Sequence, residues 1–508
     1  MQQASSGRFL SDLLVDAGIP SSTALTGAPV SVTAIDFDSH AVTDGSLFVA
    51  IPGLRSDGHR FCRDAIARGA VAVVAEHVPE PPIDASVPLV LVADSRLALS
   101  ALADAFADHP SAHLCVAGVT GTDGKTTTAT LLWNAWRAAG IAAASITTVD
   151  RRTPDGVTSN PSRQTTPEAP ELHAELARIR DLGCTHVALE TSSHGLEMHR
   201  ADDVAFRAAV FTRITTEHLE LHGTRDAYLA AKARLLERVS PRPDGIAVLD
   251  AGDPFGFPRL SAIPVATRLT YTDDDAVRAD LRARDVVPSP SGVRFTAETP
   301  WGTAAVALRL AGTFNVRNAL AALACACATG GDLASAVRGL EAADVVTGRM
   351  ERIDLGQPFE VVVDYAHTTD ALETVLHELR RTTRGRLWAV FGSAGERDVE
   401  KRAAMGGAAA RLADVSVITD EDPRDEDRQS ILEAIAGGAV AAGGRRGENV
   451  FVIADRAEAI AYAVDHAAAG DTVLCAGKGH EKTIETAAGA LPWNERAVAT
   501  AAIARRIS

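Results

Sequence analysis

The sequence of 508 residues has few aromatic side chains and no long apolar run. Aromatic residues make up 5% of the chain, and no stretch approaches the roughly 18 apolar residues that a membrane span requires. The first 14 residues lack a basic segment followed by an apolar one, so they do not resemble a secretory signal. We therefore expect a cytoplasmic protein without membrane insertion.

Basic residues and cysteines are also scarce. Fifty lysine and arginine residues face 66 acidic residues, a net charge of −16, and no basic run stands out. This balance argues against a nucleic-acid partner. Six cysteines are scattered, and the closest pair, Cys325 and Cys327, lies in the alanine-rich segment AALACACATG. Such a segment is typical of a packed core, so we predict neither a disulfide nor a metal site there.

Apolar residues are plentiful, at 46% of the chain, and can form several buried cores. At roughly 150 residues per domain, the length predicts about three domains. Short strand-like runs alternate with helical segments throughout, which is typical of an α/β fold. We predict a small α/β domain over residues 1–108, a central domain with a mostly parallel sheet over 109–344, and a Rossmann-like domain over 345–508.

The most specific motif is a glycine-bearing loop between a predicted strand and a predicted helix, GVTGTDGKTT over residues 118–127. Backbone N–H groups in such a loop surround phosphates, Lys125 neutralises them, and the Thr126 hydroxyl suits Mg²⁺. The usual spacing requires glycine at position 119, which is valine, so this is a variant loop. The predicted nucleotide-binding residues are Gly121, Thr122, Asp123, Gly124, Lys125, Thr126 and Thr127.

The segment TGTDGKTTT resembles the phosphate loop of the Mur ligase family, whose members use ATP to form amide bonds. Asp123 and Arg213 stand where the family usually has asparagine. The resemblance covers essentially the whole chain. It is closest to the members that join a diamino acid to UDP-N-acetylmuramoyl-L-alanyl-D-glutamate in peptidoglycan synthesis. It implies an N-terminal UDP-sugar-binding domain, a central P-loop ATPase-like domain and a C-terminal amino-acid-binding domain.

Glu190 and His218 follow two apolar strands of the central segment, near the phosphate loop. On residue type a carboxylate suits Mg²⁺ better than histidine does, and a lone helical lysine such as Lys232 is ordinarily solvated. The resemblance implies a metal-binding role for His218 in TEHLELHG and a CO₂-derived carbamate on Lys232. The implied catalytic residues are Lys125, Glu190, His218 and Lys232, and the implied metal ligands are Thr126, Glu190, His218 and Lys232.

The resemblance alone implies the remaining contacts. The residues facing ATP are Asn315, Asn318, Arg349, Asp364 and His367. Those holding the UDP-sugar peptide are Ser39, Leu54, Arg55, Ser56, Thr165, Thr166, Ser192 and Arg200. Those meeting the amino acid are Arg397, Glu421, Asp422, Arg424, Gly477 and Glu481.

The turn at residues 421–424, with the sequence E-D-P-R, bears on the identity of the diamino acid. Family members specific for meso-diaminopimelate typically have D-N-P-R there. Arg424 is suited to a distal carboxylate, whereas Asp422 is better suited to a free ammonium. We favour meso-diaminopimelate on the retained arginine, and L-ornithine and L-lysine stay open. Without the resemblance, a solvated acidic loop is the alternative.

The predicted reaction uses ATP to convert the γ-carboxylate of D-glutamate into an acyl phosphate, which the amine then attacks. We expect Mg²⁺ and a carbamate on Lys232 as cofactors, ATP as a substrate, and a monomer. Three alternatives stay open: a folylpolyglutamate synthetase-like ligase, a P-loop ATPase that forms no amide, and a paralogue that has lost turnover. Residues 30–61 argue against the first and Lys232 against the second, whereas Asp123, Arg213 and Asp422 motivate the third.

Overall fold

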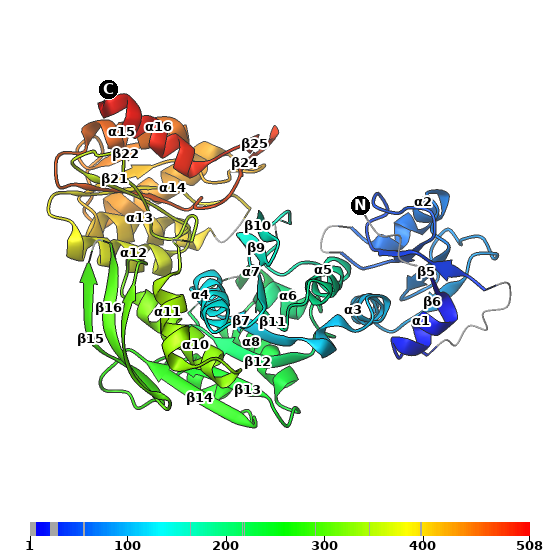
Figure 1. Cartoon of the computed structure of the whole chain (residues 1–508). Coiled ribbons are helices and arrows are strands. Elements are labelled where there is room, and N and C mark those ends of the chain that lie inside the picture. Colours follow the sequence, from blue (N-terminus) through cyan, green and yellow to red (C-terminus); the bar gives the residue numbers. More distant parts are fainter. Residues whose placement is uncertain are drawn as a thin grey trace.

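A computed structural model of the chain shows three α/β domains in a row, each built around its own sheet (Figure 1). The structure describes residues 7–20, 29–53, 56–162, 164–215, 217, 219–289, 291–344, 346–396 and 399–507. This three-domain architecture confirms the predicted α/β fold class. No helix within these ranges is long and apolar enough to cross a membrane.

The N-terminal domain has a parallel sheet in the order β3-β4-β5-β6. Its strands are β1 (Arg8–Phe9), β2 (Ser31–Val32), β3 (Ala34–Asp36), β4 (Ser46–Val49), β5 (Ala72–Ala75) and β6 (Leu89–Leu91), and its helices are α1 (Leu10–Asp16), α2 (Cys62–Ala67) and α3 (Ser95–Phe106). Strands β4 and β5 are buried throughout, because helices cover the sheet. Helix α3 also packs against α5 of the next domain.

The central sheet has eleven strands, of which β8, β11, β7, β12, β13, β14 and β15 are parallel neighbours in that order. They span Ala143–Ile146, His186–Glu190, Cys115–Thr120, Phe206–Phe211, Ile246–Asp250, Thr267–Thr272 and Leu281–Ser289. Antiparallel strands extend both edges: β9 (Asp150–Thr153), β10 (Gly156–Ser159), β16 (Gly292–Thr299) and β17 (Gly302–Leu308). Strands β16 and β17 form an antiparallel hairpin within the segment GVRFTAETPWGTAAVALRLAG.

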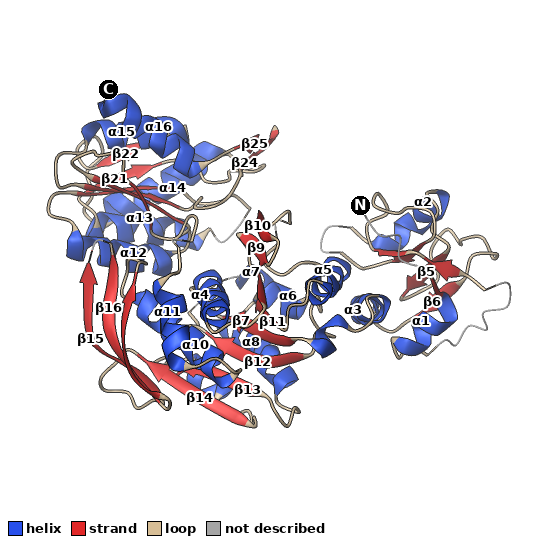
Figure 2. Cartoon of the chain, in the orientation of Figure 1, coloured by secondary structure: helices blue, strands red, loops and turns tan. Residues whose placement is uncertain are grey.

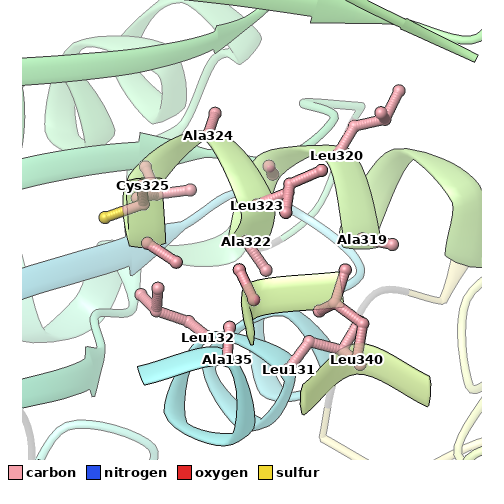
Figure 3. Packing of buried hydrophobic residues seen from close by; sticks show 14 of the residues in the cluster. Leu131, Leu132, Ala135, Ala319, Leu320, Ala322, Leu323, Ala324, Cys325 and Leu340 are labelled. Atoms are coloured by element: carbon pink, nitrogen blue, oxygen red, sulfur yellow. The ribbon is translucent and has the colours of Figure 1, made fainter. Parts of the chain in front are cut away.

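Helices cover both faces of the central sheet (Figure 2). They are α4 (Lys125–Ala138), α5 (Ala169–Asp181), α6 (Ser193–Glu197), α7 (Leu219–His222), α8 (Arg225–Val239), α9 (Gly256–Leu260), α10 (Phe314–Ala328) and α11 (Leu333–Glu341). On one face α4 packs against α10 and α11, and the alanine-rich segment forms α10 (Figure 3). Its small side chains let the helices approach closely, and Cys325 is buried in this core.

The C-terminal domain has a six-stranded sheet in the order β18-β19-β23-β20-β21-β22, parallel except for β18. Its strands are β18 (Glu351–Ile353), β19 (Glu360–Asp364), β20 (Leu387–Phe391), β21 (Val415–Ile418), β22 (Val450–Val452) and β23 (Thr472–Ala476), with a separate hairpin of β24 (Thr483–Thr486) and β25 (Gly489–Pro492). Its helices are α12 (Thr369–Thr382), α13 (Glu400–Leu412), α14 (Arg428–Ala441), α15 (Arg456–His466) and α16 (Glu495–Ile507). Ligands of such sheets bind beyond the carboxyl ends of the strands.

Candidate active site

Three neighbouring strands of the central sheet end at the same edge. Glu190, the last residue of β11, pairs with Val119 of β7, and Phe211 of β12 pairs with Thr120. The carboxyl ends of these strands therefore place Glu190, the phosphate loop and the segment after Phe211 side by side.

The phosphate loop turns sharply between β7 and α4. Gly121 and Gly124 have φ angles of +148° and +84°, which residues with a Cβ rarely adopt. A Cβ on Gly124 would collide with the side-chain oxygen of Asn318, so the loop and α10 are in close contact. Asn318 in turn donates to Asn315 at 3.0 Å. Asn315 and Asn318, both predicted to face ATP, therefore lie beside the phosphate loop.

Two lysines converge on the same loop. Lys125 Nζ donates to the carbonyls of Thr122 at 2.7 Å and Gly121 at 3.2 Å, and Lys232 Nζ donates to Gly121 O at 2.7 Å. Neither ammonium has a carboxylate within ion-pair distance in the described part of the chain. The positive charge of Lys125 is therefore available to an anionic ligand.

Lys232 is not solvated, since its residue is 1% exposed. Burial lowers the pKa of Lys232 well below its usual value, and the charge of Lys125 lowers it further. The Nζ atom lies 4.4 Å from the ring centroid of Tyr228, whose hydroxyl is 3.1 Å from Thr122 Oγ1. A lysine in this environment can lose its proton and become a neutral nucleophilic amine.

Glu190, at the carboxyl end of β11, accepts hydrogen bonds from two neighbouring residues. Its Oε2 accepts hydrogen bonds from Thr126 Oγ1 at 3.0 Å and from the backbone N–H of Thr148 at 2.8 Å. A hydroxyl and a carboxylate are hard oxygen ligands that suit Mg²⁺. The third predicted ligand, His218, lies outside the described residues.

Four residues predicted to hold the acceptor peptide lie next to Glu190. Thr165 Oγ1 accepts from the hydroxyl of Thr148 at 3.0 Å. Thr166 Oγ1 accepts from the N–H of Ser192 at 2.9 Å, and the Thr166 carbonyl accepts from Arg200 at 3.2 Å. An acceptor bound here would lie close to the phosphate loop.

A cavity of about 380 Å³ separates the central and C-terminal domains. Its lining includes the predicted nucleotide residues Asp123, Gly124, Thr126, Thr127, Asn315, Asn318, Arg349, Asp364 and His367. Arg349 reaches across to Thr126 Oγ1 at 3.5 Å, and His367 Nε2 lies 3.3 Å from Glu217 Oε1. The structure therefore brings together residues from both domains at one nucleotide-sized cavity.

Polar contacts also fix the C-terminal wall of this cavity. Asp364 accepts from the N–H groups of Met350 at 2.7 Å and Ala366 at 2.8 Å. Burial lowers the pKa of His367, but Glu217 outweighs this and raises the pKa overall. Asp364 thus orients the turn that carries Arg349, and Glu217 of the central domain favours the protonated form of His367.

The two departures from the family pattern line the same cavity. Water reaches the Asp123 side chain, yet the surrounding protein raises its pKa, and the charge of Glu217 adds to this effect. Arg213 donates to the carbonyl of Gly252 at 3.0 Å and has no carboxylate partner among the residues described. The added acid and the added base therefore face one cavity.

The predicted amino-acid residues follow strand ends of the C-terminal sheet. Glu421 and Asp422 come after β21, and Gly477 and Glu481 come after β23. Tyr365, which lines the nucleotide cavity, donates to Glu481 Oε1 at 3.3 Å. The region that contains Glu421, Asp422, Gly477 and Glu481, here called the amino-acid end of the cleft, thus adjoins the nucleotide cavity. Arg397 lies outside the described residues.

Lys478 joins the segments at this end. Its Nζ lies 2.7 Å from Asp422 Oδ1 and also pairs with Glu481. Burial lowers the pKa of Lys478, but the charges of Glu481 and Asp422 outweigh burial and raise it overall. Asp422 is therefore neutralised inside the protein and is not part of a solvated acidic loop.

The predicted UDP contacts belong to the N-terminal domain, which meets the central domain through α3 and α5 (Figure 1). Ser39 is buried and Ser56 is exposed. Leu54 and Arg55 lie outside the residues that the structure describes.

A nearby group of Asp57, His59 and His77 has the ligand spacing of a metal site. However, Nε2 of His59 accepts from the N–H of Glu76 at 2.9 Å, while Nδ1 lies 2.6 Å from Asp57 Oδ1. The nitrogen facing Asp57 must then carry the proton, and it has no lone pair for a metal. Asp57 and His59 therefore form an internal hydrogen-bond chain, and the ring of His77 stacks on that of His59.

Sequence reasoning missed Thr148, Tyr228 and Lys478. Tyr228 precedes Lys232 by one helical turn on α8. Residues at this spacing lie on the same side of a helix, so the sequence AYLAAK already contained the signal. Thr148 carries no sequence signal, because its role comes from the pairing of β8 beside β11. Lys478 lies within AGKGHE, but its ion pairs depend on how two separate loops meet.

A variant phosphate loop at the edge of a parallel sheet, facing a second α/β domain across a cavity of about 380 Å³, is typical of an enzyme that binds a nucleotide between two domains. The sequence matches the Mur ligase middle domain over residues 119–326, the Mur ligase glutamate ligase domain over 348–479, and the Mur ligase family catalytic domain over 31–107. The chain belongs to the Mur ligase family, as the resemblance predicted.

Curated relatives match nearly the whole chain. A UDP-N-acetylmuramyl-tripeptide synthetase from Roseiflexus sp. is 46% identical over 486 residues, covering 93% of this chain and 94% of the relative. A protein of the same name from Deinococcus radiodurans is 42% identical over 98% of this chain and its own full length. A UDP-N-acetylmuramoyl-L-alanyl-D-glutamate–2,6-diaminopimelate ligase from Streptomyces coelicolor is 42% identical over 93% of this chain and 92% of the relative.

Solved structures share the fold. A structure of UDP-N-acetylmuramoyl-L-alanyl-D-glutamate–2,6-diaminopimelate ligase aligns with a TM-score of 0.66 at 29% identity, covering 99% of this chain and all of the other. A Mycobacterium tuberculosis folylpolyglutamate synthase aligns with a TM-score of 0.62 at 18% identity, covering 81% of this chain and 94% of the other. The second likeness concerns the fold alone.

Proposed function

We propose that this protein uses ATP to join a diamino acid to UDP-N-acetylmuramoyl-L-alanyl-D-glutamate. The observation that carries the proposal is the shared position of three predicted sites. Thr126 and Glu190 are hydrogen-bonded at the phosphate loop, Thr148 links Glu190 to the acceptor residue Thr165, and Tyr365 links the nucleotide cavity to the amino-acid end. A ligase needs these three substrates next to one another.

The chemistry follows from the poor reactivity of a carboxylate. An oxygen of the D-glutamate γ-carboxylate attacks the γ-phosphorus of ATP, and ADP leaves, giving an acyl phosphate. The amine of the diamino acid then attacks the acyl carbon, and phosphate leaves with the former carboxylate oxygen. Lys125 and Arg349 neutralise the phosphate charge, and the facing domains exclude the water that would hydrolyse the acyl phosphate.

The residues at the strand edge fit a Mg²⁺ site. Thr126 and Glu190 would hold the ion with oxygen ligands, and bound Mg²⁺ would neutralise charge on the phosphate oxygens. Lys232 fits a carbamate, because burial lowers its pKa and so favours the neutral amine, the form that attacks CO₂. The carbamate would turn a cation into an oxygen ligand, and His218 would add a nitrogen ligand.

For the diamino acid we propose meso-diaminopimelate. Arg424 has no carboxylate partner within the described residues, so its guanidinium is available to a distal carboxylate. Relatives from Geobacillus thermodenitrificans and Streptomyces coelicolor are named for 2,6-diaminopimelate, whereas the names of the relatives from Roseiflexus and Deinococcus specify no amino acid.

The test is an assay of purified protein with ATP, Mg²⁺ and UDP-N-acetylmuramoyl-L-alanyl-D-glutamate, with meso-diaminopimelate, L-ornithine or L-lysine in separate reactions. Phosphate release and product mass are measured together. We expect a tripeptide product with meso-diaminopimelate, and phosphate release that requires the UDP-sugar peptide. Release without that acceptor would favour an ATPase, and no product with any amino acid would favour a paralogue without turnover.

A further inference from the structure

One half-buried threonine of the central domain contacts both the predicted magnesium site and the predicted acceptor site. The backbone N–H of Thr148 donates to Glu190 Oε2 at 2.8 Å, and the Thr148 hydroxyl donates to Thr165 Oγ1 at 3.0 Å. Thr148 follows β8, and β8 pairs with β11, which ends at Glu190. The sheet therefore places Thr148 between the carboxylate that would hold the ion and the hydroxyl that would meet the acceptor peptide.

The N–H of Thr148 helps to determine which oxygen of Glu190 stays available. Oε2 accepts two hydrogen bonds, one from Thr148 and one from Thr126 Oγ1 at 3.0 Å. Oε1 accepts none from the residues that the structure describes. Because both donors bind the same oxygen, the other oxygen can bind a cation. The backbone of Thr148 is thus held at a defined position relative to the proposed ion.

The hydroxyl of Thr148 determines where the Thr165 proton can point. A hydroxyl has one proton and two lone pairs. Thr165 Oγ1 accepts from Thr148, so its own proton points away from Thr148, and it meets no acceptor within the described part of the chain. Thr165 is half-buried, which leaves this proton accessible to a ligand. Thr165 can therefore donate to a carboxylate or carbonyl oxygen, and the hydrogen bond from Thr148 polarises it for this role.

Asn160 holds the two threonine segments together. Its side-chain amide donates to the carbonyl of Thr147 at 3.0 Å and to that of Gln164 at 3.2 Å. These carbonyls directly precede Thr148 and Thr165 in the chain, so the backbone is fixed on both sides of the hydroxyl contact. Removal of the Thr148 hydroxyl should therefore delete one hydrogen bond without separating the two segments.

We propose that Thr148 is a positioning residue for the acceptor peptide. Its hydroxyl directs the Thr165 proton toward an oxygen of the acceptor, and its N–H keeps this contact at a fixed distance from Glu190. The acceptor is thereby held next to the phosphate that it attacks. Thr148 acts through Thr165 and touches no reacting atom itself. This inference rests on the proposed ligase function and adds a residue to its acceptor site.

The test replaces Thr148 with valine, which has a similar shape, lacks the hydroxyl and keeps the backbone N–H. The KM of UDP-N-acetylmuramoyl-L-alanyl-D-glutamate should rise about fivefold, because the contact through Thr165 is weakened. The Kd of this peptide, measured by calorimetry with Mg²⁺ and ADP present, should rise by the same factor. The KM of ATP and the Mg²⁺ concentration for half-maximal activity should stay within about twofold of the unmodified protein.

Two further variants serve as controls. Thr148→Ser restores the hydroxyl and should return the KM of the acceptor to within about twofold of the unmodified protein. Thr185→Val removes an exposed hydroxyl at the amino end of β11, away from the site, and should change none of these values.

A double variant tests whether Thr148 acts through Thr165. Thr165→Val removes the hydroxyl that would contact the acceptor, so the KM should rise at least as much as in Thr148→Val. Adding Thr148→Val to Thr165→Val should then change the KM by less than about twofold, because no hydroxyl is left to direct. If valine at position 148 prevents folding, Thr148→Ala removes the same hydroxyl and takes its place.

Three results would overturn the inference: a rise below about twofold in Thr148→Val, no recovery in Thr148→Ser, or effects that multiply in the double variant. Failure of the underlying function would look different, because the unmodified protein would then form no tripeptide with any of the amino acids. A protein that forms the tripeptide, but whose Thr148→Val variant keeps its affinity for the acceptor, would retain the function and contradict only the role of Thr148.

Discussion

The two ends of the interdomain cleft carry their charges in opposite ways. At the phosphate loop, Lys125, Lys232, Arg213 and Arg349 bond to carbonyl or hydroxyl oxygens, and none has a carboxylate partner in the described ranges. At the amino-acid end, Lys478 pairs with Asp422 and Glu481.

Two further ion pairs stabilise the amino-acid end. Arg402, which is 2% exposed, binds both oxygens of Glu426 at 2.6 and 2.7 Å, and the N–H of Glu396 donates to Glu426 at 3.0 Å. Arg456 pairs with Glu495 in the core of the domain. The Arg402–Glu426 pair therefore ties the turn at 421–426 to the loop that leads to Arg397.

The contrast corresponds to the ligands that each end is proposed to take. Unpaired cations in a partly dry cleft are costly unless a polyanion neutralises them, so the phosphate end is stabilised by binding ATP. A zwitterionic amino acid brings both signs of charge, and loops held by internal ion pairs present fixed partners to it. The comparison predicts that charge removal abolishes activity at the first end and changes selectivity or stability at the second.

The largest effect is expected for Lys232→Ala, which breaks the phosphate end. Loss of this group should lower kcat by about 10²–10³-fold, because it removes the carbamate that would hold Mg²⁺ beside the transferring phosphate. The melting temperature should stay unchanged or rise, since a buried unpaired amine is removed. Steady-state kinetics and calorimetry check both parts, with Glu237→Ala on the exposed side of the same helix as control. Activity equal to the unmodified protein would contradict the assigned role.

Glu190→Gln should lower activity about 10–100-fold at saturating ATP, because an amide is a weaker Mg²⁺ ligand than a carboxylate. The amide oxygen still accepts from Thr126 and Thr148, so the fold is preserved. A Mg²⁺ titration checks the cause: the variant should require more Mg²⁺ for half-maximal activity. An unchanged Mg²⁺ requirement would place the ion elsewhere.

Glu426→Gln should weaken the amino-acid end in a pH-dependent way. Arg402 and the N–H of Glu396 hold the pKa of Glu426 at about 2, below its usual 4.5. The pair therefore stabilises the fold above pH 4.5, and this contribution is lost as the pH falls toward 2. The variant should be about 1–2 kcal/mol less stable at neutral pH, a moderate value because Glu426 is partly in water.

Denaturant unfolding at several pH values measures this difference. The gap between Glu426→Gln and the unmodified protein should close as the pH falls from 4.5 toward 2. Glu433→Gln, at the exposed pair with Arg446, is the matched control and should change stability much less than Glu426→Gln does. A gap independent of pH would show that charge is not the cause.

The smallest effect is expected for Asp123→Asn. The carboxylate faces the cavity that takes the triphosphate, and its removal should lower the KM of ATP about two- to tenfold. The fold and the KM of the amino acid should not change. A raised KM of ATP would instead indicate that Asp123 helps to hold the nucleotide or its metal.

Much of the fold was predictable from the sequence, because the alternation of strands and helices follows local hydrophobic patterns. FEVVVDYAH and DTVLCAGKG became β19 and β23, and the phosphate loop lies where GVTGTDGKTT predicts it. The residue type alone indicated a solvated lysine at position 232, and this was wrong, since Lys232 is buried. Periodicity on α8 could not show this, because the phosphate loop that covers Lys232 comes from another part of the chain.

Pairings between loops were not predictable from local sequence. Asp422 was expected to present a free charge to a substrate ammonium, and the structure pairs it with Lys478. That pairing requires the turns after β21 and β23 to meet, which depends on the strand order of the sheet. The same applies to Thr148, which reaches Glu190 only because β8 lies beside β11.

The most direct test of the account follows an oxygen atom through the reaction. The D-glutamate γ-carboxylate of the UDP-sugar peptide is labelled with ¹⁸O, and the released phosphate is analysed by mass spectrometry in the presence of ATP, Mg²⁺ and meso-diaminopimelate. Ligation through an acyl phosphate predicts one ¹⁸O atom in each phosphate released. Phosphate without the label, formed by attack of water on ATP, would contradict the ligase and favour an ATPase.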